Sequence, residues 1–314
     1  MRLQDITSSR PALLLAMACA RLLPRRAGYA LARGAARLIA WRRPEIYRTV
    51  RTNMQHVAGC GADDALLDQM AYNVFRYAGQ GYYDFFRAVG QPHSALLQKV
   101  EPPSAFLEMI RSENAQGRGV LVVATHMSNF DLVGLVLSYE GLSAQLLSLA
   151  DPGPAFRILN RLRATDGFEV TPIGPESLRM ALRRLANGGV VVTGADRPMM
   201  EEREWVEFFG QPAELPLGPV RLALMTGATV IVGSCYYHED GIYRVRADGP
   251  VEMVRTGRKR HDIMASARRL AAVLEEHVRA YPDQWLMFHR VWPDDSRCGA
   301  EPVQPQPSPE DQEP

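Results

Sequence analysis

The sequence lacks an apolar run long enough to cross a bilayer and a cysteine pattern that binds metal. A membrane-spanning helix needs about 18–20 consecutive apolar residues, whereas the longest candidate, Pro11 to Ala20, ends at Arg21. The four cysteines are far apart and form no C-x-x-C pair or metal-ligand spacing, which is typical of a reducing compartment. We therefore expect neither a transmembrane span nor a disulfide framework, and no metal or other cofactor.

Two further sequence signals are missing. Arg2 and Arg10 precede an apolar stretch, as in a signal peptide, but Leu22-Leu23-Pro24-Arg25-Arg26 is a poor cleavage site, so secretion is not expected. The chain also has no G-x-S-x-G motif and no cysteine in a basic context. A serine or cysteine hydrolase is therefore disfavoured.

Charge is distributed unevenly along the 314 residues, although the formal net charge is only +1. Residues 1–60 hold eleven arginines and two acidic residues, so the rest of the chain carries a net charge of −8. The basic head favours an anionic partner such as a membrane surface. Nucleic acid is not the expected partner, because the arginines alternate with leucine and alanine at helical spacing and no stacking aromatics accompany them.

The head, residues 11–57, shows arginines about three and four residues apart, which leaves an apolar face on a helix. Such a helix can lie in a bilayer interface. It can equally pack its apolar face on the protein and solvate its arginines. An aromatic-rich helical stretch over residues 63–90 follows.

After Pro102-Pro103 the pattern changes to alternating strands and helices. Strands are expected at 119–125, 189–194, 228–237 and 242–247, and helices at 131–139, 155–164, 176–187, 219–226 and 262–280. The uninterrupted valines of the first two strands predict burial on both faces. The expected fold is α/β, a central mostly parallel sheet covered by helices and preceded by an amphipathic, basic N-terminal helical region.

Three segments are expected along the chain. Residues 1–57 form basic membrane-associating helices, and residues 58–298 form the α/β domain with 58–110 as a helical lead-in. The proline-rich residues 299–314 are expected to be a disordered tail.

The first buried strand ends in a histidine that is followed five residues later by a carboxylate, in Thr125-His126-Met127-Ser128-Asn129-Phe130-Asp131. On a regular helix, five steps would leave the two side chains about 140° apart. Across a strand-to-helix turn, however, Asp131 can turn back to the imidazole and fix its tautomer. His126 then becomes a candidate general base for a substrate hydroxyl. His289 and Asp294 share the interval, but the intervening Arg290-Val291-Trp292-Pro293 cannot start a helix as the first copy does, and no buried strand leads cleanly into it.

Asp196 and Arg197 follow the second buried strand. If that strand is parallel to the first, both residues lie on the same rim as His126. An arginine there suits a phosphate, and the carboxylate suits sugar or glycerol hydroxyls. The alternative is an ordinary ion pair at a strand end.

These residues resemble the bacterial lipid A biosynthesis (lauroyl/myristoyl-type) acyltransferase family, within the lysophospholipid acyltransferase-like superfamily that carries an H-x(4)-D/E box. The resemblance covers about residues 30 to 292. It departs at Arg197, where the family usually has Gln or His, and at Met287, where Trp is common. The ordered blocks that carry it are His126 to Asp131, Arg163 with Gly167, Asp196, Val206 to Ala213, Leu217 to Ala228, and Pro282 to Leu286 with His289-Arg290.

The resemblance implies an O-acyltransferase that moves a fatty acyl group from acyl-ACP or acyl-CoA to a hydroxyl of a membrane lipid or glycolipid. His126 is expected to be the base and Asp131 its orienter, with no covalent enzyme intermediate. Arg163 and Arg197 are candidates for an anionic headgroup or carrier phosphate. Backbone amides of the helix that begins near Asn129 are candidates to stabilise the oxyanion, which makes Asn129 a candidate substrate-binding residue.

The expected location is the inner face of the cell membrane, as a peripheral or monotopic protein. A non-catalytic membrane-surface lipid-binding protein on the same fold is the alternative. The acceptor, the chain length and the choice between ACP and CoA stay open.

Overall fold

A computed structural model describes residues 10–59, 61–151, 153–198 and 203–293. Its centre is a six-stranded sheet in the order β3-β2-β4-β1-β7-β8. Every neighbouring pair is parallel except β7 and β8. The strands are β1 (Val120–Ala124), β2 (Ala144–Ser148), β3 (Phe168–Pro172), β4 (Val190–Gly194), β7 (Thr229–Tyr237) and β8 (Tyr243–Val251).

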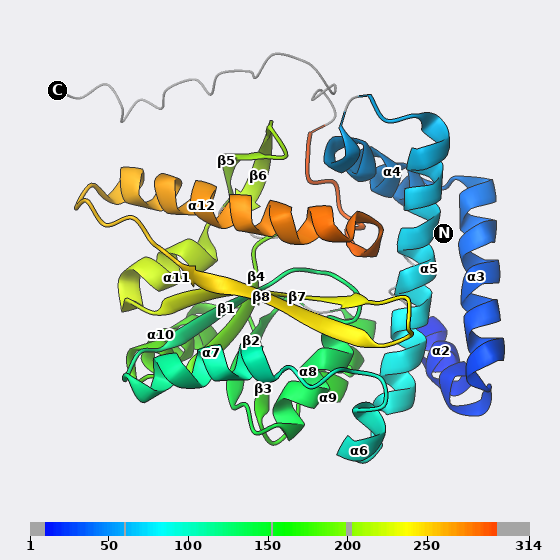
Figure 1. Cartoon of the computed structure of the whole chain (residues 1–314), viewed down its shortest axis with the longest axis horizontal. Helices are drawn as coiled ribbons and strands as arrows, with labels where there is room; N and C mark the ends of the chain where they lie inside the picture. Colours follow the sequence, from blue (N-terminus) through cyan, green and yellow to red (C-terminus); the bar gives the residue numbers. More distant parts are fainter. Residues whose placement is uncertain (1–9, 60, 152, 199–202, 294–314) are drawn as a thin grey trace.

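Helices cover both faces of this sheet (Figure 1). They are α2 (Arg10–Leu22), α3 (Arg25–Arg42), α4 (Glu45–Ala58), α5 (Asp64–Ala88), α6 (His93–Leu96), α7 (Ser104–Ala115), α8 (Phe130–Tyr139), α9 (Pro154–Arg163), α10 (Pro175–Ala186), α11 (Gly218–Thr226), α12 (Lys259–Ala280) and the 3-10 helix η1 (Pro282–Gln284). None of these helices is both long enough and apolar enough to cross a membrane.

Alternate residues of the central strands enter two different hydrophobic cores. In β1, Leu121 and Val123 pack with α10, α11 and α12, whereas Val120 and Val122 pack with α7, α8 and α9. Successive side chains of a strand point to opposite faces, so a strand covered on both sides must be apolar throughout. The α/β fold predicted from the valine runs is therefore confirmed.

The amino-terminal region is three helices rather than one continuous stretch. Pro24 precedes α3 and Pro44 precedes α4, and proline ends a helix because its ring and missing N–H disrupt the preceding turn. Both α2 and α3 pack along α5. Gly28 of α3 lies against the Tyr83 ring of α5, where a Cβ would come within 2.2 Å of the ring. This close approach requires glycine.

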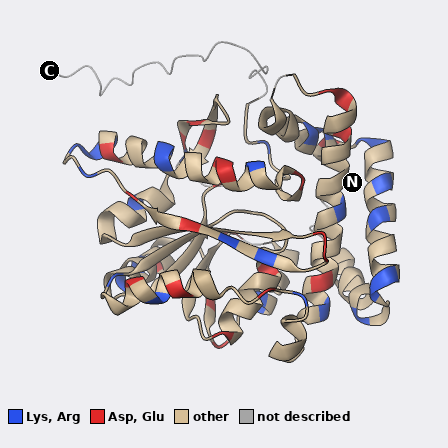
Figure 2. Ribbon diagram, in the orientation of Figure 1, with Lys and Arg blue, Asp and Glu red and all other residues tan. Residues whose placement is uncertain are grey.

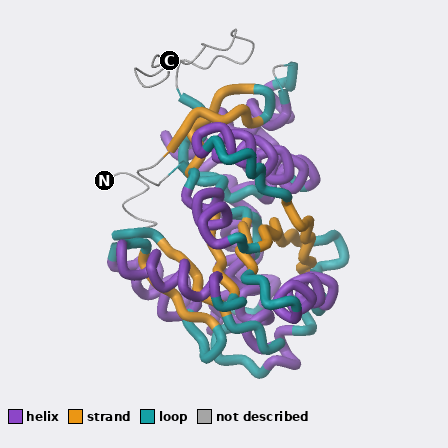
Figure 3. Tube along the Cα trace, turned by 90° about the vertical axis from the view of Figure 1, so that its left-hand side faces the viewer, coloured by secondary structure: helices purple, strands orange, loops and turns teal. Residues whose placement is uncertain are grey.

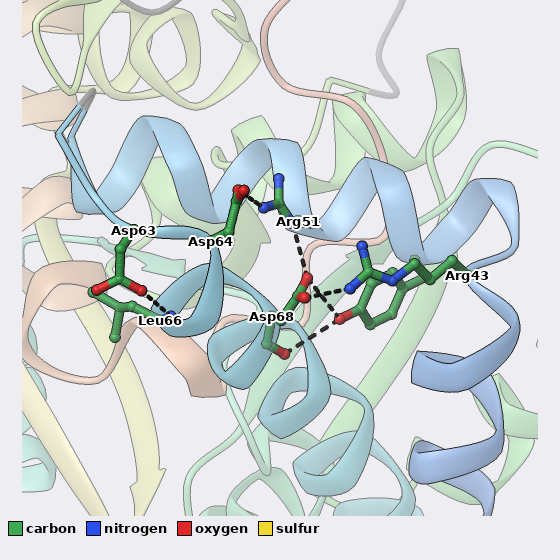
Figure 4. Close-up of polar contacts among 7 residues, drawn as sticks. Arg43, Arg51, Asp63, Asp64, Leu66 and Asp68 are labelled. Atoms are coloured by element: carbon green, nitrogen blue, oxygen red, sulfur yellow. Dashed lines mark hydrogen bonds and ion pairs between the residues drawn. The ribbon is translucent and has the colours of Figure 1, made fainter.

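Helix α4 is tied to α5 by a group of ion pairs around Asp68 (Figure 4). Arg51 Nε lies 2.9 Å from Asp68 Oδ1, and Arg43 reaches the other carboxylate oxygen. Arg51 also pairs with Asp64. Apolar residues of α4 such as Val50 and Met54 join the core beneath α12. Part of the positive charge of the head is therefore paired with carboxylates of the protein itself.

Each predicted strand and helix of the α/β region is present, with no end shifted by more than four residues. The two short strands β2 and β3 were not predicted. Neither was the antiparallel hairpin of β5 (Arg203–Phe208) and β6 (Gln211–Pro216), which Figures 1 and 3 show apart from the main sheet. The proposed tail and Asp294 lie outside the described residues.

Candidate active site

The site is built where β1 and β4 end side by side. The parallel register pairs Ala124 with Gly194, so the residues that follow, His126 and Asp196, meet at one edge of the sheet. The expectation that both strands present their polar residues on one rim is confirmed. Gly194 leaves room for the imidazole, because a Cβ there would lie 2.8 Å from His126 Cε1.

The loop that carries His126 is held by the segment after α12. Leu286 N donates to the carbonyl of His126 at 2.8 Å, and Ser128 N donates to the carbonyl of Gln284 at 3.1 Å. Met127 and Trp285 form an antiparallel bridge. The closing motif of the chain is therefore a support for the histidine loop.

Asp196, which is completely buried, binds His126 at two points. Its Oδ1 lies 2.6 Å from His126 Nδ1, and its Oδ2 accepts from the His126 backbone N–H at 2.8 Å. Oδ2 also accepts from Trp285 Nε1 at 2.9 Å. Although burial opposes its ionisation, the contacts with His126 and Trp285 lower the pKa of Asp196 to about 2. This carboxylate places the proton on Nδ1 and leaves Nε2 as the free nitrogen.

His126 is poised to accept a proton. Burial lowers its pKa below the ordinary value of 6.5, and the nearby Arg197 guanidinium adds to this effect, while Asp196 opposes it. The imidazole is therefore neutral at neutral pH, which is the form a general base requires. The ring of Phe130 packs edge-on against it, with the centroids 5.6 Å apart.

The predicted contact between Asp131 and His126 is wrong. Asp131 forms a bidentate ion pair with Arg163 of α9, at 2.6 Å from Nε and 3.2 Å from Nη2. The reason is geometric, because Asp131 lies in the first turn of α8 and that helix packs against α9, while Asp196 already occupies Nδ1. The two residues of the H-x(4)-D box therefore have separate partners: His126 contacts Asp196, and Asp131 pairs with Arg163.

Three of the predicted substrate-binding side chains are engaged within the protein. Asn129 is the N-cap of α8, with Oδ1 accepting from Leu132 N at 3.2 Å and Nδ2 donating to the carbonyl of Gly81 at 2.9 Å. Asp196 has both oxygens occupied, so it is not available for sugar or glycerol hydroxyls. Arg163 is likewise paired with Asp131, and its guanidinium lies over the Phe130 ring.

The structure adds two residues that the sequence analysis did not select. Trp285 donates to Asp196, and His289 lies within electrostatic range of His126 and Arg197. The pKa of His289 is lowered to about 4, by burial first and then by Arg197 and His126, so this imidazole is neutral as well. The only sequence signal was the closing motif that contains both residues.

A neutral histidine held by a buried carboxylate lies at the carboxyl edge of a parallel sheet, where α/β proteins bind their ligands, and such a histidine can remove a proton from a bound hydroxyl. The model of the bacterial lipid A biosynthesis acyltransferase family matches residues 10–293. The chain belongs to this family and is an O-acyltransferase. The family resemblance seen in the sequence is thereby confirmed.

Curated relatives carry a more specific name. A phosphatidylinositol mannoside acyltransferase of Mycobacterium tuberculosis is 25% identical over 251 residues, which are 77% of this chain and 76% of the relative. The phosphatidylinositol mannoside acyltransferase of Mycolicibacterium smegmatis is 26% identical over 248 residues, covering 77% and 78% of the two chains.

Proposed function

We propose that this enzyme transfers a fatty acyl group from an acyl thioester to a hydroxyl of a membrane glycolipid, with His126 as general base and Asp196 as its positioning residue. The observation that carries the proposal is the 2.6 Å contact between Asp196 Oδ1 and His126 Nδ1. It leaves Nε2 free to accept a proton.

The reaction needs one proton relay. His126 Nε2 takes the proton of the acceptor hydroxyl while the hydroxyl oxygen attacks the thioester carbonyl carbon. The tetrahedral intermediate then collapses, the C–S bond breaks, and the thiolate takes the proton back from Nε2. The products are an ester and a free thiol. Asp196 stabilises the imidazolium between the two proton transfers.

The substrate classes rest on the relatives and on this chemistry. The curated relatives are named for phosphatidylinositol mannoside, which supports a glycolipid acceptor. A thioester donor, as acyl-ACP or acyl-CoA, suits the site because a thiolate leaves readily once the base has activated the hydroxyl.

The exposed side of α3 supports attachment to the membrane. Leu31, Leu38 and Trp41 are 54%, 48% and 75% exposed, and at 100° per residue they fall within an arc of about 80°. Arg26, Arg33 and Arg37 are exposed beside that arc, and Figure 2 shows basic positions recurring along this helix. An apolar stripe bordered by arginines is the pattern of a helix that lies in a bilayer interface.

We define this face of α3, with the exposed leucines of α2, as the lipid-facing surface. On α2, Leu14, Leu15 and Leu22 are 47%, 66% and 82% exposed. Exposed large apolar side chains on adjacent helices favour an interaction surface. Attraction of arginines to anionic lipid favours the inner face of the cell membrane and a peripheral or monotopic protein.

The proposal is tested by thioester consumption with purified protein, acyl-ACP or acyl-CoA, and a mannosylated phosphoinositide in vesicles. His126→Ala is expected to lower turnover on the order of 10²–10⁴-fold. His261→Ala is the matched control, because His261 is an exposed residue at the start of α12. It should retain wild-type turnover.

Two results would contradict the proposal. Unchanged turnover in His126→Ala excludes this residue as the base. No thioester consumption by the wild type with any glycolipid or lysophospholipid acceptor would identify a lipid-binding protein that has kept the fold without the chemistry.

A further inference from the structure

The site contains two arginines with different surroundings. Arg163 has a bidentate carboxylate partner in Asp131. Arg197 directly follows Asp196, and its Nε atom is buried without a hydrogen-bond partner. Among the described residues, no ion pair joins Arg197 to a carboxylate. Within the part of the chain that the structure describes, one positive charge therefore lies at the site without a contacting counter-charge.

Neither nearby carboxylate is free to neutralise Arg197. Asp196 accepts from the His126 ring, the His126 backbone and Trp285, which engages both of its oxygens. Asp131 has both oxygens on Arg163. The effect reaches the base, because Arg197 lowers the pKa of His126 more than any other charged neighbour does. Arg197 is partly buried, and a charge withdrawn from water calls for a partner of opposite sign.

The reaction itself creates that partner. When His126 accepts the hydroxyl proton, the imidazolium pairs with Asp196, and Arg163 keeps its pair with Asp131. Of the charges named here, all from described residues, that leaves the Arg197 guanidinium as the cation opposite the negative charge that develops on the thioester carbonyl oxygen. Each of these positive charges has a negative partner only after the tetrahedral intermediate has formed. Arg197 therefore stabilises the intermediate more than it stabilises the bound substrates.

We propose that Arg197 is a catalytic residue whose guanidinium donates a hydrogen bond to the oxyanion of the tetrahedral intermediate. This inference rests on the proposed acyl transfer. The backbone amides at the start of α8 were the candidates for this role, but two of them are engaged within the protein. Phe130 N donates to the Met127 carbonyl at 3.2 Å, and Leu132 N donates to Asn129 Oδ1 at 3.2 Å.

The test is steady-state kinetics of Arg197→Gln with the thioester and a mannosylated phosphoinositide. Loss of an oxyanion donor is expected to lower kcat on the order of 10²–10³-fold and to change KM by no more than about threefold. The acid limb of the kcat/KM profile should also move to higher pH, since the cation that opposes protonation of His126 is gone. Arg179→Gln, an exposed arginine of α10, is the matched control.

Arg197→Lys keeps the charge but not the planar fork. It is expected to recover about tenfold of the lost kcat and to return the acid limb toward its wild-type position. This variant decides the question if Arg197→Gln does not fold, because its kcat must fall below that of the wild type while KM stays unchanged.

Other outcomes overturn the inference. A raised KM for the acceptor with kcat retained would show that Arg197 binds an anionic group of the ground-state substrate. An unchanged kcat in both Arg197 variants would show that the oxyanion is stabilised elsewhere. Either result, obtained with an active wild type and an inactive His126→Ala, leaves the proposed function intact. An inactive wild type would instead refute the proposed function.

Discussion

The carboxyl edge of the sheet and the outer face of α3 both concentrate charge, but they hold it in opposite ways. At the sheet edge, Asp196 is completely buried and the side chain of Asp131 is only 8% exposed, and each is fixed by a specific partner. On α3, Arg26, Arg33 and Arg37 are exposed to solvent.

This difference sets the size of the expected effects. A buried charge acts singly, because low dielectric and fixed geometry make each contact strong. Exposed charges act together, and salt weakens each one. Changes at the sheet edge should therefore affect catalysis strongly and individually, whereas changes on α3 should add up in membrane affinity.

Replacing Asp196 is the change with the largest expected effect. Asp196→Asn removes the charge that stabilises the imidazolium, so kcat/KM is expected to fall on the order of 10²–10⁴-fold. The acid limb of the pH profile should move to lower pH, because the anion that raises the pKa of His126 is lost. Asp131→Asn leaves the contact between Asp196 and His126 in place, so its acid limb should match the wild type. If Asp131→Asn shifted the acid limb of the pH profile and Asp196→Asn did not, Asp131 would be the residue that orients His126.

The second effect concerns the lipid-facing surface. Arg26, Arg33 and Arg37 changed together to Gln should weaken binding to anionic vesicles by about 3 kcal/mol, at about 1 kcal/mol per arginine. High salt should reduce wild-type binding similarly. Arg179, Arg183 and Arg268 changed together make a matched control on α10 and α12. Sedimentation with vesicles measures the effect of the substitutions and that of salt. Equal losses of vesicle binding in the two triple variants would show that α3 has no special role.

A third prediction concerns stability in acid. The folded-state pKa of Asp196 is about 2, against an ordinary value of 3.8, so its ionisation stabilises the folded protein above about pH 4. That contribution, about 2 kcal/mol for a shift of this size, is lost as pH falls toward 2. Urea unfolding between pH 6 and 2.5 should show a steeper loss of the free energy of unfolding in the wild type than in Asp196→Asn. Parallel curves would contradict the assignment.

The smallest effect is expected where arginines of the head are already paired. Asp68→Asn removes the shared partner of Arg43 and Arg51 and should lower the free energy of unfolding by about 1 kcal/mol. Asp64, whose side chain is 91% exposed, serves as the control, and Asp64→Asn should have almost no effect. Vesicle binding should be unchanged in both, because α4 is tied to α5.

Much of the fold could be predicted, because the positions of apolar residues in the sequence match the positions that the fold buries. The valines of β1 and β4 indicated a sheet covered on both faces, and both strands lie at its centre. The strands β2 and β3 are five residues long, as β1 and β4 are, but they mix polar with apolar residues, as in Gln145 and Glu169. Such mixed segments owe their conformation to pairing with a neighbouring strand, which local sequence does not encode.

The site could be predicted in part. His126 was found because a histidine directly after a buried strand stands out, and Asp196 because it follows the parallel strand. His126 and Asp196 are 70 positions apart in the sequence, so no local sequence pattern could predict their contact. The five-residue interval suggested that Asp131 contacts His126. It shows only that the two residues share one loop-to-helix segment, in which the Asp131 side chain points to Arg163 of α9 and not to His126.

The sequence by itself determined the class of fold, the family, and the division into a basic head and an acidic body, and it singled out the histidine that we propose as the base. These features depend on composition, periodicity and ordered motifs. Only the tertiary structure decided which carboxylate holds His126, which arginines are neutralised and which remain exposed. Pairing depends on distances between side chains from different strands and helices, and these distances exist only once the sheet edge and the helices around it have packed together.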